Sequence, residues 1–373
     1  MKINYLKLDN FRNYDSAELY WDEQVNLLHG RNAQGKSNLL EAVCYLGIAT
    51  SFRGAPDPEL IRWGEDYFFL AGKVTREDGS RIDLTAAANR RKQRRWRVDG
   101  EARTRLSDVV GLLHTVIFAP EDIGLVKEGP DARRRFLNQQ LSQLDQEYCR
   151  LLISYNRVLR QRNALLKQWE PGREAENGFE EQLATWDEQM IELGSAVALR
   201  RQQTVKQLSE LAGELHRGLS KGEELALSYE NSFSPHEELA DLDQCRQAFR
   251  SELARVARSE QQRGLSLVGP HRDELAITID GRPARSFGSQ GQQRTAALSL
   301  KLAELELARS LRGEYPVLLL DDVLSELDEQ RRQEIMRLAV GKTQTFITAV
   351  DGDLPPLSCR RWRVEAGRVS REN

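Results

Sequence analysis

The sequence predicts an α/β protein with a head of two lobes, which are separated by a short antiparallel helical arm. Three observations support this. A glycine-rich segment at residues 29–37 lies between a strand pattern and an apolar helix pattern. The last hundred residues alternate helix and strand, which is typical of a largely parallel sheet covered by helices. Between them, residues 137–197 carry apolar side chains at heptad spacing, which indicates packed helices.

Composition restricts the class of protein. Of the 373 residues, 40% are hydrophobic and 30% are charged, as in a soluble chain that forms a core. No apolar run approaches the roughly 18 residues of a membrane span, and the N-terminus does not resemble a signal peptide. We therefore expect a cytoplasmic, nucleoid-associated protein with no membrane partner. The cysteines are isolated from one another, which favours reduced thiols over disulfides or a zinc site: Cys44, Cys149, Cys245 and Cys359.

The first lobe is predicted to be rich in strands. Apolar residues alternate in "INYLKLDNFRNY", and "QVNLLHG" is a short buried-strand pattern that ends at Gly30. A helix over 36–47 follows. The runs "DYFFLAGKVTRED", "SRIDLTAAA" and "RRWRVDGEA" then predict further strands joined by turns at "EDGS" and "VDGE".

The arm is predicted from a heptad seam that runs from Leu137 to Leu165, in which Arg162 is the single polar member. After a turn at 171–178 the same spacing resumes from Leu183 to Val197. We expect two antiparallel helices, the first about 35 residues and so about 50 Å long. A further strand and helix precede "LSLVGPHRDELAITIDG", which returns to β character.

The second lobe is predicted to alternate a helix over about 291–311, the strand "YPVLLLDDV", a helix after Ser325 and the strand "QTFITAV". The predicted domains are therefore an N-terminal lobe at 1–126, the arm at 127–262 and a C-terminal lobe at 263–373.

The segment "GRNAQGKS" satisfies the spacing G-x-x-x-x-G-K-[ST] between a strand and a helix. Glycines allow backbone N–H groups to surround phosphates, and the helix N-terminus adds partial positive charge. Lys36 is expected to reach the β- and γ-phosphates of ATP, and the Ser37 hydroxyl to bind Mg²⁺. A chance glycine loop is disfavoured by the flanking elements. The predicted ATP-binding residues are Gly30, Arg31, Asn32, Ala33, Gln34, Gly35, Lys36 and Ser37.

A second half of this site is predicted in "PVLLLDDVLSELD". Asp321 ends an apolar strand and is the second Mg²⁺ ligand that such a site needs. Asp322, the next residue, is expected to point to the other side of the strand end and to polarise the attacking water. Lys36, Asp321 and Asp322 are the predicted catalytic residues.

A third segment, "SFGSQGQQRTAALSL", places Ser289, Gly291 and Gln292 at the start of a helix. A hydroxyl and free amides at a helix N-terminus make an anion site. If this segment and the loop at 30–37 lie on opposite faces of the molecule, one chain can hardly bring both to the same γ-phosphate. We therefore expect a head-to-tail dimer in which this segment contacts the ATP of the other copy.

This order of segments resembles the ATP-binding-cassette ATPases: "GRNAQGKS" as Walker A, "GSQGQQ" as signature, "VLLLDD" as Walker B and "SELD", with Ser325 and Asp328, as D-loop. The helical insertion is similar to that of the SMC, Rad50 and RecF group, and its arm is too short for SMC or Rad50. The chain resembles the RecF family nearly end to end, in "LDNFRNY", "FAPED", "RRRFLNQQLSQ" and, most specifically, "GPHRDEL".

The resemblance implies a function. RecF-like proteins bind ATP and Mg²⁺, dimerise on ATP, bind gapped DNA and single-strand/double-strand junctions, and promote RecA loading with RecO and RecR. Three positions depart from transporter-type cassettes. Glu121 stands where a glutamine is usual, Thr348 or Asp351 stands where a switch histidine is usual, and Asp322 replaces a glutamate. These departures imply slow hydrolysis that acts as a dimerisation switch.

The DNA contact is predicted in a local basic run around Trp96, inside a chain of net charge −3. Such a run supplies phosphate contacts without reading sequence. Two alternatives stay open: the run is a solvated hairpin face, or DNA binds the arm at Arg133, Arg134 and Arg135. The predicted residues are Arg90, Arg91, Lys92, Arg94, Arg95 and Arg97.

Two other functions compete with a DNA-binding ATPase. One is a cassette ATPase that acts on a protein partner, as the nucleotide-binding subunit of a transporter does. The other is a small-molecule P-loop kinase, which has no use for the signature segment. Neither accounts for "GPHRDEL".

Overall fold

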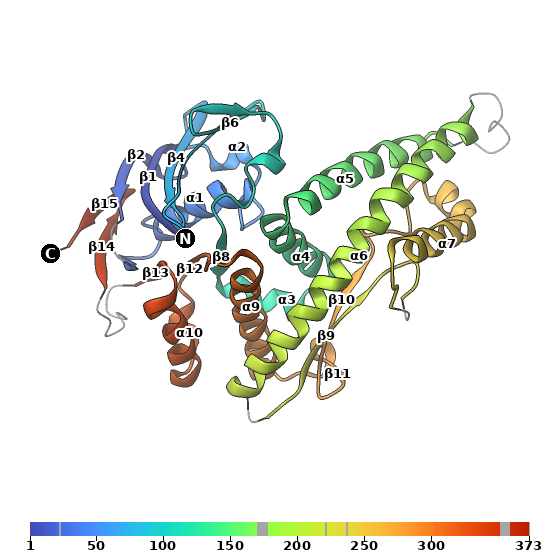
Figure 1. Cartoon of the computed structure of the whole chain (residues 1–373). Coiled ribbons are helices and arrows are strands. Elements are labelled where there is room, and N and C mark those ends of the chain that lie inside the picture. The colour runs from blue at the N-terminus through green and yellow to red at the C-terminus, as the bar shows by residue number, and fades with distance from the viewer. Residues whose placement is uncertain (22–23, 170–177, 221, 236–237, 351–358, 373) are drawn as a thin grey trace. The chain divides into compact units, whose positions relative to one another are not determined.

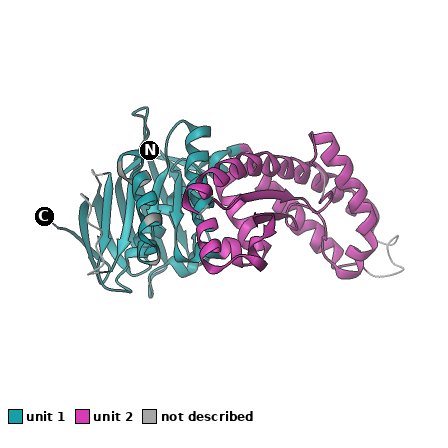
Figure 2. Cartoon of the chain, turned by 90° about the horizontal axis from the view of Figure 1, so that it is seen from below, with its two compact units in different colours: residues 1–123, 142–146, 297–373 teal, residues 124–141, 147–296 magenta. Residues whose placement is uncertain are grey.

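The computed structural model describes residues 1–21, 24–169, 178–220, 222–235, 238–350 and 359–372 (Figure 1). The chain forms two compact units (Figure 2). Unit 1 comprises Met1–Ile123, Ser142–Gln146 and Ala297–Asn373, and unit 2 comprises Gly124–Leu141 and Glu147–Ala296. Unit 1 is thus assembled from both ends of the chain, as expected for a head that carries an inserted arm.

The first sheet of unit 1 is antiparallel, with strand order β2-β1-β4-β5-β6-β7. One side of it is apolar because inward residues alternate with exposed ones, as in the alternating burial of β4. Its strands are β1 (Lys2–Phe11), β2 (Tyr14–Tyr20), β4 (Tyr67–Thr75), β5 (Arg81–Asn89), β6 (Arg94–Val98) and β7 (Glu101–Arg103).

The second sheet of unit 1 has the order β15-β14-β3-β13-β12-β8, and all its neighbouring pairs except β14–β15 are parallel. Parallel strands end at a common carboxyl edge, where ligands bind in such sheets. The Walker A loop follows β3 and Asp321 follows β12 at that edge. The strands are β3 (Val25–His29), β8 (Thr115–Phe118), β12 (Val317–Leu320), β13 (Thr345–Ala349), β14 (Arg360–Glu365) and β15 (Arg368–Arg371).

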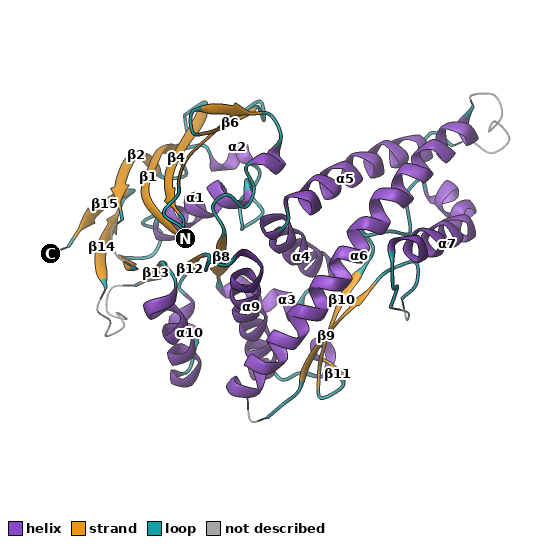
Figure 3. Ribbon diagram, in the orientation of Figure 1, coloured by secondary structure: helices purple, strands orange, loops and turns teal. Residues whose placement is uncertain are grey.

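Helix α1 (Lys36–Ile48) contacts β1, β4 and β5 of the first sheet and β8 and β13 of the second (Figure 3). A helix between two sheets is apolar all round, and α1 is buried on nearly every face. Tyr45 on α1 stacks on Trp96 of β6 and packs edge-on against Phe68 of β4. The remaining helices of unit 1 are α2 (Asp57–Leu60), α10 (Glu329–Lys342), most of α9 (Gln290–Arg312) and three short 3₁₀ turns at 106–108, 120–123 and 323–326.

Unit 2 is a helical arm on a small sheet of order β11-β10-β9. Its core joins Tyr155, Met190, Phe233 and Phe249 with other apolar side chains. The strands are β9 (Leu225–Glu230), β10 (Glu274–Ile279) and β11 (Arg282–Pro283), and the helices are α3 (Gly124–Lys127), α4 (Pro130–Leu144), α5 (Gln146–Leu166), α6 (Phe179–Leu219), α7 (Leu242–Arg263) and α8 (Ala284–Phe287).

The arm differs from the prediction at its start, because the expected helix of about 35 residues is interrupted at Asp145 into α4 and α5. Tertiary contacts cause the break. The side-chain amide of Gln143 bonds both backbone groups of Thr115, and the Gln143 carbonyl accepts from Arg312. Gln146 donates to the Ser107 carbonyl. These contacts attach residues 142–146 to unit 1. An uninterrupted helix could not make all of them.

Two further differences concern strands. β14 and β15 extend the parallel sheet beyond β3, although their sequence was not predicted to form strands. In "GPHRDEL" only the end belongs to a strand, since β10 begins at Glu274. The turn predicted at 171–178 lies outside the described residues except for Gly178. The predicted arm ends at residue 262, whereas unit 2 extends to Ala296. The domain limits given above stay predictions.

Candidate ATP-binding site and basic surface

The Walker A loop leaves β3 and enters α1 with the geometry that its glycines require. Gly30 has φ 148° and Gly35, the N-cap of α1, has φ 117°. A Cβ on Gly30 would lie 2.2 Å from the carbonyl oxygen of Val364. No side chain caps α1, so its first amides are directed at the loop. The loop is therefore an anion site of the type that binds phosphate.

Two segments distant in sequence hold this loop. From the turn between β1 and β2, the Asn13 amide donates to the Gln34 carbonyl (2.9 Å) and the Tyr14 hydroxyl donates to the Gly35 carbonyl (3.0 Å). From the turn between β14 and β15, the Ala366 N–H donates to the Gln34 side chain (2.7 Å) and the Gly367 N–H to its carbonyl (3.1 Å). The loop is thus preorganised by neighbouring strands.

Lys36 occupies the position expected of a phosphate-binding lysine. Its ammonium donates to the carbonyls of Gly30 (2.8 Å) and Arg31 (3.1 Å), and its side chain is 4% exposed. These carbonyls keep the charge inside the loop that a phosphate would enter.

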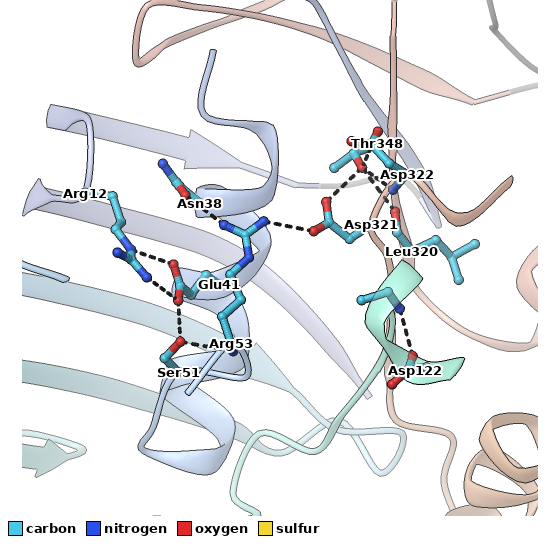
Figure 4. A network of polar contacts seen from close by, with 11 residues as sticks. Arg12, Asn38, Glu41, Ser51, Arg53, Asp122, Leu320, Asp321, Asp322 and Thr348 are labelled. Atoms are coloured by element: carbon cyan, nitrogen blue, oxygen red, sulfur yellow. Dashed lines mark hydrogen bonds and ion pairs between the residues drawn. The ribbon is translucent and has the colours of Figure 1, made fainter. Parts of the chain in front are cut away.

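Asp321 lies beside the start of α1, which joins the two predicted halves of the site. It accepts a hydrogen bond from the Ser37 hydroxyl. It also accepts one from Arg53, whose Nη2 lies 3.1 Å from Asp321 Oδ2 (Figure 4). Burial raises the pKa of the Asp321 carboxyl, although Ser37, Arg53 and Thr348 act in the opposite direction.

Asp322 does not point away from Asp321, contrary to the prediction. The Thr348 hydroxyl lies 3.0 Å from Asp321 Oδ1 and 3.1 Å from Asp322 Oδ1, and it accepts the Asp322 backbone N–H at 2.7 Å (Figure 4). Strand alternation fails here because Asp322 leaves β12 in the left-handed conformation, with φ 51°. Both carboxylates therefore converge on Thr348, one of the two residues predicted at the switch position. The other, Asp351, lies outside the described residues.

A chain of polar contacts that includes Glu41 of α1 leads to Asp321, and no sequence pattern predicted a role for its members. Arg12 forms two hydrogen bonds to the buried Glu41 (2.8 and 2.9 Å), and Ser51 donates to Glu41 (2.5 Å). The Ser51 hydroxyl in turn accepts the backbone N–H of Arg53 at 3.1 Å. Arg53 reaches Asp321 across this chain (Figure 4). No motif marks Arg53, because only folding brings residue 53 beside residue 321.

The site suits Mg²⁺ by its donor set. Mg²⁺ prefers oxygen ligands, and in nucleotide sites it uses one or two protein groups plus phosphate oxygens and water. The Ser37 hydroxyl and the Asp321 carboxylate are hydrogen-bonded to each other, so two oxygen donors of the kind that Mg²⁺ uses lie side by side. In the described part of the chain no group of three acidic, histidine or cysteine side chains could hold a metal by itself.

Glu121, the predicted substitute for the glutamine, lies in the 3₁₀ turn Pro120–Ile123 after β8, and its side chain is exposed. Its neighbour Asp122 turns inward, and its carboxylate accepts the Ala119 N–H at 2.8 Å. Burial raises the pKa of Asp122. β8 pairs with β12, so this turn lies at the same sheet edge as Asp321.

The signature segment belongs to unit 2 and starts α9 with a capping box. The Ser289 hydroxyl accepts the Gln292 N–H (3.2 Å), and the Gln292 side chain accepts the Ser289 N–H (2.7 Å). Ser289 and Gly291 are exposed. In the predicted D-loop, Ser325 donates to the Asp322 carbonyl and Asp328 caps α10 by accepting the Arg331 N–H.

The basic run separates into two kinds of residue. Arg94 forms a two-bond ion pair with the buried Asp57, and Arg90 Nε donates to the Glu65 carbonyl at 2.6 Å. Trp96 is 5% exposed and stacks on Tyr45. Four cations are exposed and have no ion-pair partner among the described residues: Arg91, Lys92, Arg95 and Arg97.

The arginines of the arm are mostly engaged. Arg133 pairs with Glu274 through two bonds of 2.7 Å, and Arg134 donates to the Asp273 carbonyl and pairs with Asp131. Arg135 is exposed. Only one of the three therefore resembles the free cations of the hairpin.

Comparison with known proteins places the chain. The family model "RecF/RecN/SMC N terminal domain" matches residues 2–356. The DNA replication and repair protein RecF of Bacillus subtilis is 41% identical to this chain over 355 residues, which cover 94% of each of the two chains. The protein of the same name from Halothermothrix orenii is 41% identical over 376 residues, which cover 100% of this chain and 99% of the relative. The chain belongs to the RecF family.

Solved structures agree with this membership of the RecF family. The structure of the recombination mediator protein RecF-ATP in the RecFOR pathway aligns with a TM-score of 0.92 at 35% identity, covering 100% of this chain and 97% of that one. An Smc head domain from Pyrococcus furiosus aligns with a TM-score of 0.55 at 14% identity, covering 99% and 95%, which shows the fold alone. This RecF-family chain therefore has the ABC-type ATPase-head fold with a helical arm. Within the described residues, no helix has the length and apolar character of a membrane span.

Proposed function

We propose that this chain is an ATP-dependent, DNA-binding recombination mediator. It dimerises on ATP, binds gapped or junction DNA, and promotes RecA loading with RecO and RecR in DNA repair and replication restart. The observation that carries the proposal is the meeting of Lys36, Ser37 and Asp321 at one carboxyl edge, in a chain 35% identical to a RecF solved with ATP.

ATP acts in this proposal as the ligand that selects the dimer. Walker A residues 30–37 bind the phosphates, Ser37 and Asp321 hold Mg²⁺, and Ser289, Gly291 and Gln292 of the other copy contact the γ-phosphate. A ligand shifts an equilibrium only by its differential affinity, and an ATP shared between two heads contributes contacts in the dimer alone. When bound, Mg²⁺ neutralises charge on the β- and γ-phosphates.

Hydrolysis in this proposal is slow and resets the switch. Asp322 polarises the attacking water, and the Thr348 hydroxyl orients it through Asp322 Oδ1. The D-loop residues Ser325 and Asp328 and the exposed Glu121 stay candidates for contacts made on dimerisation. The four free cations of the β5–β6 hairpin and β6 bind DNA phosphates.

Sedimentation velocity with and without ATP and gapped DNA tests the proposal. Wild type should shift from monomer to dimer with ATP and sediment with DNA only then. Asp322→Asn, which keeps size but loses the carboxylate, should dimerise and persist as a dimer. Ser289→Arg should bind ATP but stay monomeric, since a bulky cation occupies the contact with the partner's nucleotide.

Matched variants separate the trans contact from folding. Ser289→Thr keeps the capping oxygen of α9 and should dimerise, whereas Ser289→Arg loses the cap, at a cost of about 1 kcal/mol. Lys36→Arg should fold but lose ATP-driven dimerisation, because a guanidinium does not reproduce the point charge. Wild type that stays monomeric with ATP, or a dimeric Ser289→Arg, would contradict the trans arrangement. A dimer that never binds DNA would favour an ATPase with a protein partner.

A further inference from the structure

Trp63 is an exposed indole on an ordered turn. It is 97% exposed, whereas Trp96 in the same unit is 5% exposed. The Glu65 N–H donates to the Arg62 carbonyl at 3.0 Å, and Gly64 has φ 93°, as in a type II turn with Trp63 at its corner. The turn is fastened to β1, since Ile61 bridges Phe11 and the Arg62 N–H donates to the Asn10 carbonyl. An apolar ring held in solvent by a rigid scaffold is available to a ligand.

The hairpin between β5 and β6 is bonded to this turn. The Arg90 N–H donates to the Asp66 carbonyl (3.1 Å), and Arg90 Nε donates to the Glu65 carbonyl (2.6 Å). The register of β4 and β5 places the turn and the hairpin at the same end of the sheet, because Tyr67 at the start of β4 pairs with Asn89 at the end of β5. Trp63 and the tip of the hairpin therefore form one surface of unit 1.

The tip of this hairpin presents cations in a fixed backbone. The Asn89 side chain accepts the N–H groups of Arg91 (3.1 Å) and Gln93 (3.0 Å), and Lys92 is held at φ 61°. Arg91 and Lys92 are exposed and carry no ion pair among the described residues. The acids of the adjoining turn are Glu65, which pairs with Arg62, and Asp66.

We propose that Trp63 stacks on an unpaired base of single-stranded DNA whose phosphates are held by Arg91 and Lys92. The inference rests on the proposed DNA-binding function. It adds that the bound DNA is single-stranded at this surface and that Trp63 selects it. Base–aromatic stacking needs a free base face, which a single strand or a junction offers and a continuous duplex does not. Cations beside the ring bind the backbone without reading sequence.

The surface fits nucleic acid better than a protein partner. A protein interface has a contiguous apolar centre with few charges. Here a single exposed ring lies on a turn that is bonded to the hairpin carrying the exposed Arg91 and Lys92. The other exposed aromatic of this end, Tyr67, is only half exposed. A ring for the base and flanking charges for phosphates are the two parts of a single-strand site.

The experiment compares Trp63→Ala, Trp63→Phe and Tyr20→Ala. Tyr20 is the control, because it is an exposed aromatic that pairs with Tyr5 at the opposite end of β1. Each variant is titrated with ATP present against labelled oligo-dT, a blunt duplex and a gapped duplex, by fluorescence anisotropy. Trp63→Ala should bind oligo-dT on the order of tenfold more weakly and the blunt duplex within about twofold of wild type. Trp63→Phe should retain most of the affinity, and Tyr20→Ala all of it.

Salt dependence separates stacking from charge. Trp63→Ala should keep the wild-type slope of log affinity against log salt on oligo-dT. Arg91→Ala with Lys92→Ala should lower that slope by about 1.4, because each lost phosphate contact on a single strand removes about 0.7. Intrinsic fluorescence should be quenched by oligo-dT in wild type and much less in Trp63→Phe. Tyr20→Ala, which lies outside the proposed site, should keep the wild-type slope and the wild-type rate of ATP hydrolysis.

The outcomes distinguish this inference from the proposed function. Wild-type affinity of Trp63→Ala for oligo-dT, beside a wild type that binds gapped DNA, overturns the stacking site and leaves the function intact. Equal weakening on oligo-dT and blunt duplex also overturns it, since stacking is not then the interaction lost. A wild type that binds none of the three DNAs overturns both.

Discussion

Thr348 is the residue on which the carboxylates of the candidate ATP site converge. Its hydroxyl accepts the Asp322 N–H and has one proton to share between Asp321 Oδ1 and Asp322 Oδ1. It is also nearly fully buried. A residue that touches both acids can orient a carboxylate without contacting nucleotide itself. If Asp322 acts on water as proposed, we expect Thr348 to be a positioning residue.

Thr348→Val keeps the shape and removes the hydroxyl. We expect hydrolysis in a single turnover to fall about tenfold, which is less than the roughly 10²- to 10⁴-fold that a positioned acid or base contributes, because the acid itself remains. ATP affinity should stay within about threefold. Thr348→Ser keeps the hydroxyl and should restore the rate. Stability should fall by about 1–3 kcal/mol in the valine variant, because the Asp322 N–H loses its acceptor. Wild-type turnover by Thr348→Val would remove Thr348 from the mechanism.

Arg162 is the polar member of the arm's heptad seam, and the fold gives the reason. It is 1% exposed and donates to Asp187 (2.6 Å), Glu260 (2.6 Å) and Ser266 (2.8 Å), and it thereby joins α5, α6, α7 and the segment before "GPHRDEL". Glu260 is fully buried, and burial raises the pKa of its carboxyl. A charge in this position is tolerated because every donor that points inward has an acceptor.

At the scale of the helical element, Arg162→Met should destabilise the arm by about 3–5 kcal/mol at pH 7, since it leaves Glu260 buried and unpaired. The loss should shrink as the pH falls below the raised pKa of Glu260, because a protonated carboxyl needs no cation. The measurement is urea unfolding at several pH values, followed in the helical signal.

Two variants test whether the buried charge is the cause. Arg162→Met combined with Glu260→Gln should recover much of the loss, because neither charge is then buried. Arg250→Ala breaks the exposed Arg250–Glu188 pair between α6 and α7, and its effect should be too small to resolve. Equal losses from Arg162→Met and Arg250→Ala would contradict this account.

On the scale of the whole molecule, each unit contains a histidine held neutral. Burial lowers the pKa of His114 in unit 1 to about 3 and that of His271 in unit 2 to about 4. His271 Nε2 lies 3.1 Å from the Ser266 carbonyl, which can only accept, so Nε2 carries the proton. Nδ1 then accepts the Tyr155 hydroxyl at 2.7 Å, and a second proton would remove that acceptor.

Acid should therefore weaken both units. Below pH 6.5 the unfolded chain binds protons that the folded chain excludes, so the free energy of unfolding falls as the pH drops from about 6.5 towards 4. For His271 the free energy of unfolding should fall by up to about 3 kcal/mol over this pH range. Buried acids with raised pKa, such as Asp273, act in the opposite direction. The comparison of wild type with His271→Gln isolates the histidine, and wild type should lose more stability in this window. Parallel pH profiles would refute the assignment.

Local pattern predicted most of the head. The strand–loop–helix around residues 30–37, the alternation after residue 290 and the apolar strand before Asp321 depend on short-range spacing, and each element formed where the pattern indicated it. The arm's second helix followed its heptads in the same way. The break at Asp145 did not follow the pattern, since Thr115 and Arg312 lie too far along the chain to enter a local rule.

The sequence by itself determined the family, and it predicted the nucleotide and the residues of the Walker segments, because glycines, a lysine and strand-end acids indicate a phosphate site at fixed spacing. Only the tertiary structure decided which polar groups surround them. It brought Asn13 and the β14–β15 turn onto the loop, Arg53 and Thr348 onto Asp321, and Arg94 onto Asp57. It also buried Trp96 and exposed Trp63. Composition cannot separate two tryptophans near arginines. Trp96 is buried because the register of β6 places its ring on the side of the sheet that α1 covers, whereas Trp63 lies at the corner of a turn outside the strands.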